Sequence, residues 1–308
     1  MTLALLFPGQ GSQHVGMGSG LAAGEPVASE VFAEADEALG FSLSSLMRDG
    51  PSEELTETQN AQPALLAHSV AALRVLGIRY PTSTSPAFGA GHSLGEFSAY
   101  VAAGTVTFVD ALRAVRLRGE LMSEAGKDSP GTMAAILGLN VRDVREVCKK
   151  VSRGVCVPAN FNSAGQVVIS GDLPGVEEGI VLAKEAGAKR AIQLNVSGAF
   201  HSPLMEPAAE ELKVFLDGIE FSDPTFPVIA NATADPVTTG DQARTLLVRQ
   251  LVSPVRWTES IEVMTSSGVD RFLEIGSGRV LTTLNRRNAK GLQSSALGEP
   301  EDFNNLEV

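Results

Sequence analysis

The spacing of hydrophobic positions changes twice along this chain and divides it into three stretches. In the first stretch, short apolar runs alternate with segments whose apolar residues recur every three or four positions, the spacing of amphipathic helices. We expect strands at 3–7 and 86–90, and helices at 26–39, 60–77, 94–103 and 107–125. This alternation of strands and helices indicates a parallel sheet covered by helices.

The middle stretch has shorter elements in a different order. We expect strands at 131–139, 155–162, 166–171 and 189–196, and helices at 141–151 and 173–187. The order β-α-β-β-α-β is the ferredoxin-like arrangement. We therefore predict an α/β protein in which a small ferredoxin-like subdomain, 128–198, is inserted into a large, α/β-hydrolase-like parallel-sheet subdomain formed by 1–127 and 199–308. A cleft between two such parts is a natural place for a substrate.

The parallel pattern resumes in the third stretch. Apolar runs predict strands at 227–231 and 271–275, and helical spacing predicts helices at 241–251 and 278–287. The tail from Gly291 is polar and short, and we expect its end to be mobile.

A G-x-S-x-G sequence stands between the predicted strand 86–90 and the helix that follows it. It reads Gly91-His92-Ser93-Leu94-Gly95. A serine between a strand and a helix sits on a sharp turn, the nucleophile elbow, that only flanking glycines accommodate, and the turn exposes the hydroxyl. The first amides of the new helix then point toward whatever the serine attacks. The pentapeptide by itself also fits a glycine-rich turn with an incidental serine.

Composition and charge narrow the classes of function. The chain has 308 residues and a net charge of −12, which argues against a nucleic-acid binder. No basic residue precedes the first apolar run and no stretch approaches the length of a membrane span, so we expect a cytoplasmic protein if the source is bacterial. Cys148 and Cys156 match no metal spacing, and we expect them to be small core residues. No metal and no resident cofactor are indicated.

An attacking serine needs a base, and the chain has four histidines. His92 adjoins Ser93, and neighbouring side chains at a sharp turn point apart. His68 lies in the middle of a predicted helix, and His14 lies in a loop that could face the site. We favour His201, because it follows the last strand of the inserted unit, at the mouth of the predicted cleft. No acidic residue between Ser93 and His201 has a clear catalytic context, so a backbone carbonyl is a candidate for fixing the imidazole tautomer.

Several further segments occur together with the elbow. They are Phe7-Pro8-Gly9-Gln10-Gly11-Ser12-Gln13, Gln62-Pro63-Ala64, Gly91-His92-Ser93-Leu94-Gly95-Glu96, Arg118-Gly119, Asn160-Phe161-Asn162-Ser163, Gly198-Ala199-Phe200-His201-Ser202 and Gln250-Leu251-Val252-Ser253-Pro254-Val255-Arg256-Trp257. In this order, the set closely resembles the malonyl-CoA:acyl-carrier-protein transacylases of bacterial type II fatty acid synthesis. The resemblance extends from near the N-terminus to about Ala289.

The resemblance implies a two-step exchange. Ser93 takes the malonyl group from coenzyme A as an ester, and the phosphopantetheine thiol of acyl carrier protein then removes it. His201 would be the base, oriented by the backbone carbonyl of Gln250. The backbone amides of Gln10 and Leu94 would form the oxyanion hole, in which one donor is typically worth about 10²–10³ in rate. Coenzyme A is then part of the substrate and no cofactor is needed.

Arg118 is the expected partner of the malonyl carboxylate, because arginine offers a permanently charged, bidentate fork. The alternative from the residues alone is a solvated helix position. In related acyltransferases a Phe before the histidine accompanies malonyl choice, so Phe200 predicts malonyl over methylmalonyl. Gln62, Asn160 and Asn162 are expected to line the cleft, although amides in turns also satisfy local backbone groups.

Acyl carrier protein is usually acidic, so docking on this acidic chain needs a local basic patch. We propose a patch formed by Arg286, Arg287, Lys290, Lys189 and Arg190. The alternative is that these residues lie at a solvated helix end, where the helix dipole favours positive charge. We expect a monomer that binds neither membrane nor nucleic acid. Three other functions stay open: a stand-alone acyltransferase serving a polyketide synthase, a serine esterase, and a catalytically silent binding protein. The esterase would need a carboxylate and a later histidine, and none follows His201.

Overall fold

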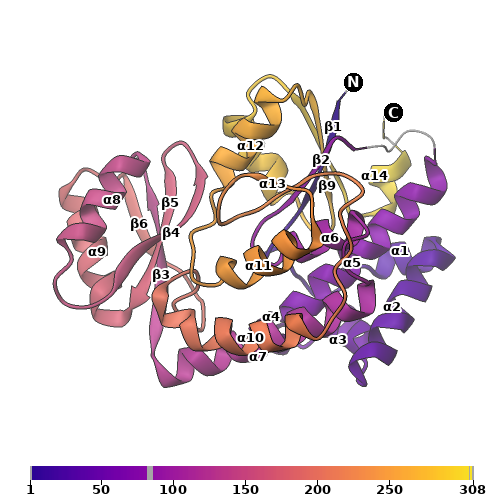
Figure 1. Ribbon diagram of the computed structural model, residues 1–308, viewed down its shortest axis with the longest axis horizontal. Coiled ribbons are helices and arrows are strands. Elements are labelled where there is room, and N and C mark those ends of the chain that lie inside the picture. The colour runs from indigo at the N-terminus through magenta and orange to yellow at the C-terminus, as the bar shows by residue number, and fades with distance from the viewer. Residues whose placement is uncertain (1, 82–85, 305, 307–308) are drawn as a thin grey trace.

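The protein contains two β-sheets, one large and one small, each with its own helices (Figure 1). The computed structural model describes residues 2–81, 86–304 and 306. The larger, helix-covered part contains the first strand, Leu3–Phe7, and the last helix, Pro300–Asn304, and the smaller part projects from one side of it (Figure 1).

The large sheet is parallel apart from one edge strand. Its order across the described chain is β10 (Gln293–Leu297), β9 (Arg271–Ile275), β1 (Leu3–Phe7), β2 (Phe88–Gly91), β7 (Val228–Ile229) and β8 (Pro236–Val237), with only β8 antiparallel to its neighbour. In the central register, Leu5 pairs with Gly89 of β2 and with Leu273 of β9. The predicted parallel sheet is confirmed, and β1 and β2 lie side by side at its centre.

Helices cover both faces of this sheet. They are α1 (Ser19–Gly24), α2 (Pro26–Leu39), α3 (Leu43–Asp49), α4 (Ser52–Thr56), α5 (Thr58–Arg79), α6 (Gly95–Ala102), α7 (Phe108–Asp128), α10 (Glu206–Asp217), α11 (Gly240–Gln250), α12 (Trp257–Ser266), α13 (Val280–Asn288) and α14 (Pro300–Asn304), with a short 3₁₀ turn at Pro203–Met205. Side chains of β1 alternate between the faces: Leu5 and Phe7 join one apolar cluster, and Leu6 joins the other. A strand buried on both faces reads as the continuous apolar run seen in the sequence.

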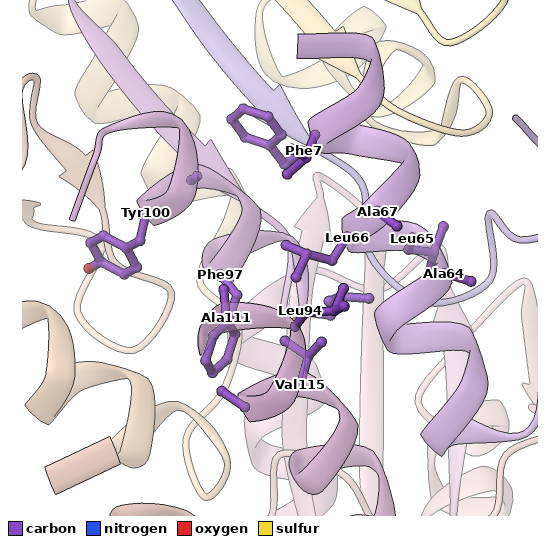
Figure 2. Close-up of a cluster of buried hydrophobic side chains, with 14 of the residues drawn as sticks. Phe7, Ala64, Leu65, Leu66, Ala67, Leu94, Phe97, Tyr100, Ala111 and Val115 are labelled. Atoms are coloured by element: carbon purple, nitrogen blue, oxygen red, sulfur yellow. The ribbon is translucent and has the colours of Figure 1, made fainter. Parts of the chain in front are cut away.

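The helix that carries the elbow, α6, is held between α5 and α7. Leu94 and Phe97 lie among Leu66 of α5 and the side chains of Ala111 and Val115 of α7 (Figure 2). Packing on two sides fixes the position of the helix that begins just after Ser93.

One helix of the described chain, α5, is long and apolar enough to cross a membrane, which corrects the expectation that no stretch approaches that length. Its apolar window is 78% buried inside the structure. The adjacent α2, α6 and α7 supply that burial, so α5 is a core helix of the fold. Core helices that are covered all round carry the same composition as membrane spans.

The small sheet has the predicted ferredoxin-like topology. Its strands are β3 (Gly131–Leu137), β4 (Cys156–Ser163), β5 (Gln166–Asp172) and β6 (Arg190–Gln193), and its helices are α8 (Val141–Lys150) and α9 (Leu173–Glu185). The order β4-β5-β3-β6, antiparallel throughout the described pairs, is that of a split βαβ unit. The boundaries proposed at 127/128 and 198/199 stay a prediction.

The polar tail departs from expectation. Residues 293–297 form β10, which pairs in parallel with β9 from Gln293 to Leu297, and α14 follows it. β10 is an edge strand and is only partly buried, so its residues need not be apolar. The sequence therefore lacks the apolar run that predicts a buried strand. The expected mobility of the last residues concerns positions that lie largely outside the described part.

Candidate active site

Ser93 stands on a tight turn between β2 and α6, as its flanking glycines predict. Its φ of 53° lies in the left-handed region, which L-residues adopt rarely and mostly at functional sites. A Cβ at Gly91 would lie 1.9 Å from the backbone of Gly95, and a Cβ at Gly95 would lie 2.2 Å from the carbonyl oxygen of Phe7. Neither position accepts a side chain, so both glycines are required for the turn.

His201 is the histidine that reaches the serine. Its Nε2 is 2.8 Å from Ser93 Oγ. Its Nδ1 is 3.0 Å from the carbonyl oxygen of Gln250 and 3.2 Å from that of Ser253. Two carbonyl oxygens only accept hydrogen bonds, so Nδ1 carries the proton and Nε2 is left to accept from the serine hydroxyl. The geometry is that of a nucleophile and its base without a carboxylate.

The other histidines lie elsewhere. His92 Nε2 is 2.9 Å from Asn162 Oδ1, and its ring packs near that of Trp257. His68 is fully buried, with Nε2 3.0 Å from the Gly298 carbonyl oxygen. His14 faces the hydroxyl of Ser277. The preference for His201 therefore agrees with the geometry.

The surroundings of His201 keep its imidazole neutral. Burial lowers its pKa to about 3, and the nearby positive charge of Arg118 adds to the effect. The hydrogen bonds from Nδ1 to the two carbonyl oxygens act in the opposite direction. The base is therefore unprotonated at neutral pH and ready to accept a proton.

Arg118 lies beside the nucleophile and is almost fully buried, with 1% of its surface exposed. Nη2 donates to Ser93 Oγ at 3.1 Å and to the side-chain oxygen of Gln250 at 2.9 Å, while Nη1 donates to Gln62 Oε1 at 2.7 Å. Burial lowers its pKa to about 10, and the charge of Glu96 limits that fall, so the guanidinium stays charged at pH 7. A solvated helix position is excluded for this residue.

One N–H group of the Arg118 guanidinium is left for a ligand. Nε is buried and has no hydrogen-bond partner among the described residues. Nε and Nη2 form the side edge with which arginine binds both oxygens of a carboxylate, and here Nη2 already donates to Ser93 Oγ and to Gln250. A buried, charged donor without a partner is costly, and a carboxylate next to Ser93 would satisfy it.

Gly119 lets α7 approach α5 closely. A Cβ there would lie 2.6 Å from Gln59 Cα and 2.7 Å from the Thr58 carbonyl oxygen, at the start of α5. The side chain of Arg118 can therefore reach Gln62 on α5.

The three candidate amides take different positions. Gln62 is fully buried and accepts from Arg118, so it supports the guanidinium and does not form part of the cleft surface. Asn160 lies on β4, 6% exposed, beside Val255. Asn162 uses its side chain to contact His92, which connects the small sheet to the elbow.

The expected oxyanion donors lie where the loop after β1 meets the elbow. A Cβ at Gly9 would lie 2.4 Å from the His92 carbonyl oxygen, so this loop packs directly against the turn. Within the described residues, the backbone N–H groups of Gln10 and Leu94 donate to no other backbone group. Both are therefore free to donate to a developing oxyanion, although the role itself stays a prediction.

One cavity reaches His201, and a second reaches the expected oxyanion residue Gln10. A cavity of about 500 Å³ reaches His201 and lies between β4 and the loop at Val252 and Pro254. Another, of about 370 Å³, reaches Gln10 and the start of α5. Phe200, 5% exposed, precedes the base on the chain. Among the described residues, no group of three or more His, Cys, Asp or Glu side chains is placed to hold a metal ion.

Sequence reasoning missed two residues that support the elbow. Asn231 accepts from the Ser93 backbone N–H at 2.7 Å and donates to the Gly91 carbonyl oxygen at 2.7 Å. Glu96 is fully buried and accepts from the Asn231 backbone N–H at 3.0 Å. Asn231 directly follows the apolar run of β7, and the carboxyl ends of parallel strands are where sites gather. The sequence did contain a signal for Glu96, because an acidic residue stands there among the apolar positions of α6.

The chain matches known proteins over nearly its full length. The family model for the acyl transferase domain matches residues 4–298. Malonyl CoA-acyl carrier protein transacylase of Escherichia coli (strain K12) is 49% identical over 298 residues, which are 96% of each chain. The protein of the same name from Bacillus subtilis (strain 168) is 49% identical over 301 residues, 97% of this chain and 94% of that one.

Solved structures agree with this match. The crystal structure of an acyl carrier protein S-malonyltransferase from Vibrio cholerae superimposes with a TM-score of 0.96 at 45% identity, covering 100% of both chains. A malonyl-transacylase in complex with a type II PKS acyl-carrier protein superimposes with a TM-score of 0.95 at 46% identity, covering 98% of both. By sequence and by fold, this chain belongs to the acyl transferase domain family.

Proposed function

We propose that this protein transfers a malonyl group from malonyl-CoA to the phosphopantetheine thiol of acyl carrier protein, through a malonyl ester on Ser93. The observation that carries this proposal is the buried Nε–H of Arg118, which has no partner among the described residues and belongs to the guanidinium that donates to Ser93 Oγ beside His201. The relatives at 49% identity bear the corresponding name, which supports the same substrate.

In the first half-reaction, Ser93 Oγ attacks the thioester carbonyl carbon of malonyl-CoA and gives its proton to His201 Nε2. The C–S bond then breaks, and the leaving sulfur takes that proton as the thiol of coenzyme A. The backbone N–H groups of Gln10 and Leu94 are proposed to stabilise the oxyanion, which costs them no existing backbone hydrogen bond within the described chain.

In the second half-reaction, the phosphopantetheine thiol gives its proton to His201 Nε2 and its sulfur attacks the ester carbonyl. The bond to Ser93 Oγ breaks, and the proton returns to the serine. The carbonyl of Gln250 holds the imidazole in one orientation through both halves.

Arg118 connects recognition of the malonyl carboxylate with the base strength of His201. Its charge lowers the pKa of His201, after burial, which is the larger cause. A malonyl carboxylate paired with the guanidinium neutralises that charge, so His201 becomes a stronger base when the correct acyl group is bound. A neutral acyl group leaves the buried Nε–H of Arg118 without a partner.

A series of contacts connects the two groups of basic residues proposed to bind the carrier protein. Arg286 and Arg287 are exposed near the end of α13, and the next residue, Asn288, donates to the Asn162 carbonyl oxygen at 2.8 Å, at the end of β4. The β4–β5 turn there contacts the loop beside exposed Lys189, because the Gly138 N–H donates to the Gly165 carbonyl oxygen and Lys189 packs on Gly138. The proposed residues (Arg286, Arg287, Lys290, Lys189 and Arg190) form no ion pair within the described chain.

The physiological carrier is proposed to be that of fatty acid synthesis, with the enzyme acting as a cytoplasmic monomer. A polyketide carrier is the second candidate, because a malonyl-transacylase of 46% identity is known in complex with a type II PKS acyl-carrier protein. Rates of transfer to the two kinds of carrier protein, measured side by side at equal concentration, decide between them.

The deciding experiment is intact-mass analysis after mixing the protein with malonyl-CoA. We expect a malonyl adduct in the wild-type protein, none in Ser93→Ala, and loss of the adduct when a carrier protein with its phosphopantetheine arm is added. Hydrolysis of a p-nitrophenyl ester without malonyl transfer would instead favour an esterase. Absence of any adduct in the folded wild-type protein would reject the proposal.

A further inference from the structure

Glu96 is a buried carboxylate that takes no part in the proton transfers described above. It is the second residue of α6, three positions after the nucleophile, with 0% of its surface exposed. Burial raises its pKa to about 7, and hydrogen bonds from Gln250 and Asn231, together with the charge of Arg118, limit the rise. Burying a carboxylate costs free energy unless hydrogen-bond donors compensate for the lost water, so its donors indicate its role.

The main partner of Glu96 is the side-chain amide of Gln250. Gln250 Nε2 donates to Glu96 Oε2 at 2.7 Å and to the Ser93 carbonyl oxygen at 3.0 Å. Both are acceptors on the same side of the amide, so the nitrogen must face them. The amide oxygen then faces the opposite side, where it accepts from Arg118 Nη2 at 2.9 Å.

A rotated amide would break this arrangement. Turning the Gln250 carboxamide by half a turn would place its NH₂ group against the Arg118 guanidinium, two donors facing each other. The guanidinium would lose one of the two amide oxygens that hold it, the other belonging to Gln62. Its Nε–Nη2 edge would then no longer be held beside Ser93.

We propose that Glu96 is a positioning residue for recognition of the acyl carboxylate: by accepting from Gln250 Nε2 it fixes the amide oxygen toward Arg118 and so holds the guanidinium next to Ser93. This proposal rests on the malonyl transfer proposed above. Glu96 acts through Gln250 and touches neither substrate nor the reacting atoms. Its second hydrogen bond, from the Asn231 backbone N–H, also supports the elbow.

The two contacts of Glu96 predict different defects. Loss of the Gln250 contact misplaces Arg118 and slows acylation by malonyl-CoA, while acylation by acetyl-CoA, whose acyl group has no carboxylate, is spared. Loss of elbow support alone would slow both reactions equally. The ratio of the malonyl to the acetyl rate therefore separates positioning of Arg118 from a merely structural role.

The test measures single-turnover formation of acyl-Ser93 by intact mass, with malonyl-CoA and with acetyl-CoA. We expect Glu96→Leu to lower the malonyl-to-acetyl ratio by about 10-fold or more, the size of one lost charge-assisted contact. Glu96→Gln retains an acceptor oxygen for Gln250 and can turn its NH₂ toward the Tyr100 hydroxyl, which lies beside the carboxylate, so it should keep most of the ratio. Glu124→Leu, which removes an exposed carboxylate from α7, is the control and should leave the ratio unchanged.

A second variant covers the case in which Glu96→Leu does not fold. Gln250→Leu removes the amide but keeps the backbone carbonyl that orients His201, and it should lower the ratio to a similar extent. The double variant should be no worse than either single one, because both act in one chain of contacts. Equal slowing of both acyl groups in the folded variants would overturn the proposal, whereas a wild-type protein without a malonyl adduct would instead reject the proposed function.

Discussion

The Nδ1 atom of His201 lies 3.0 Å from the backbone carbonyl oxygen of Gln250, so a neutral group orients this base. A carboxylate in that place would raise the proton affinity of the imidazole, and a carbonyl does so far less. Burial and Arg118 consequently keep the pKa of His201 at about 3. The buried charge of Arg118 is therefore one of the causes, after burial, that keep the imidazole of His201 neutral.

The first prediction concerns the pH dependence of acylation. A base with a lowered pKa stays unprotonated as the pH falls, so loss of activity shifts to lower pH. We expect the second-order rate constant of malonyl-Ser93 formation, which reports the free enzyme, to change little from pH 8 to pH 6, as measured by quenched flow with malonyl-CoA well below saturation. Glu96, which contacts Gln250 and has a pKa of about 7, is a buried group beside the site that does titrate in this range. A fall in rate centred near pH 6.5 that persists in Glu96→Gln would contradict the prediction.

The second prediction concerns the guanidinium of Arg118. Lysine keeps the charge but cannot offer two parallel donors or hold Gln62 and Gln250 at once. We expect Arg118→Lys to lower kcat/KM for malonyl-CoA by about 100-fold and to alter single-turnover acylation by acetyl-CoA much less. Arg113→Lys, an exposed position on the same helix, is the matched control. An equal fall in the rates of acylation by malonyl-CoA and by acetyl-CoA would show that Arg118 does not recognise the malonyl carboxylate.

The third prediction concerns Phe200, the buried neighbour of the base. An added methyl group in a tight pocket typically costs about 10–200-fold in kcat/KM. We expect the wild-type protein to prefer malonyl-CoA over methylmalonyl-CoA within that range, and Phe200→Ser to narrow the preference in a competition assay read by mass. Phe215→Ser, on α10, serves as the control for loss of a partly buried ring. Comparable transfer from both thioesters by the wild-type protein would refute the idea.

The fourth prediction concerns docking of the carrier protein. Charge reversal of Arg286 and Arg287, both exposed on α13, should raise the apparent KM for acyl carrier protein several-fold and leave the KM for malonyl-CoA unchanged. The effect should shrink as salt is added, because exposed charges are screened. Reversal of Arg48 and Arg113, which are exposed on α3 and α7, changes the net charge equally and should not alter either KM. An unchanged KM in the first variant would place docking elsewhere.

The sequence predicted those parts of the site that depend on local spacing. Gly91, Ser93 and Gly95 are neighbours on the chain, and the strand and helix around them follow from short apolar patterns. Glu96 and Asn231 escaped assignment because their contact joins residues 135 positions apart, and only the packed sheet brings them together. Residues 293–297 escaped for a different reason: an edge strand is covered on fewer sides, so its sequence can stay polar.

The last prediction concerns stability and His68, which is buried on α5 with Nε2 at the Gly298 carbonyl oxygen. Burial lowers its pKa to about 4 from an ordinary value of 6.5, so the unfolded chain binds a proton there more readily than the folded one. Its contribution to stability is therefore complete above pH 6.5 and is lost as the pH falls toward 4. Between pH 7 and pH 5 that loss amounts to about 2 kcal/mol.

His68→Gln can still donate to the Gly298 carbonyl oxygen but does not titrate. We expect its free energy of unfolding, measured with urea, to fall by about 2 kcal/mol less than that of the wild-type protein between pH 7 and pH 5. His92, His201 and Glu96 titrate alike in both proteins, so their contributions cancel in the comparison. Equal losses of stability in the two proteins would mean that His68 accepts a proton in the folded state, in conflict with its burial between α5 and the end of β10.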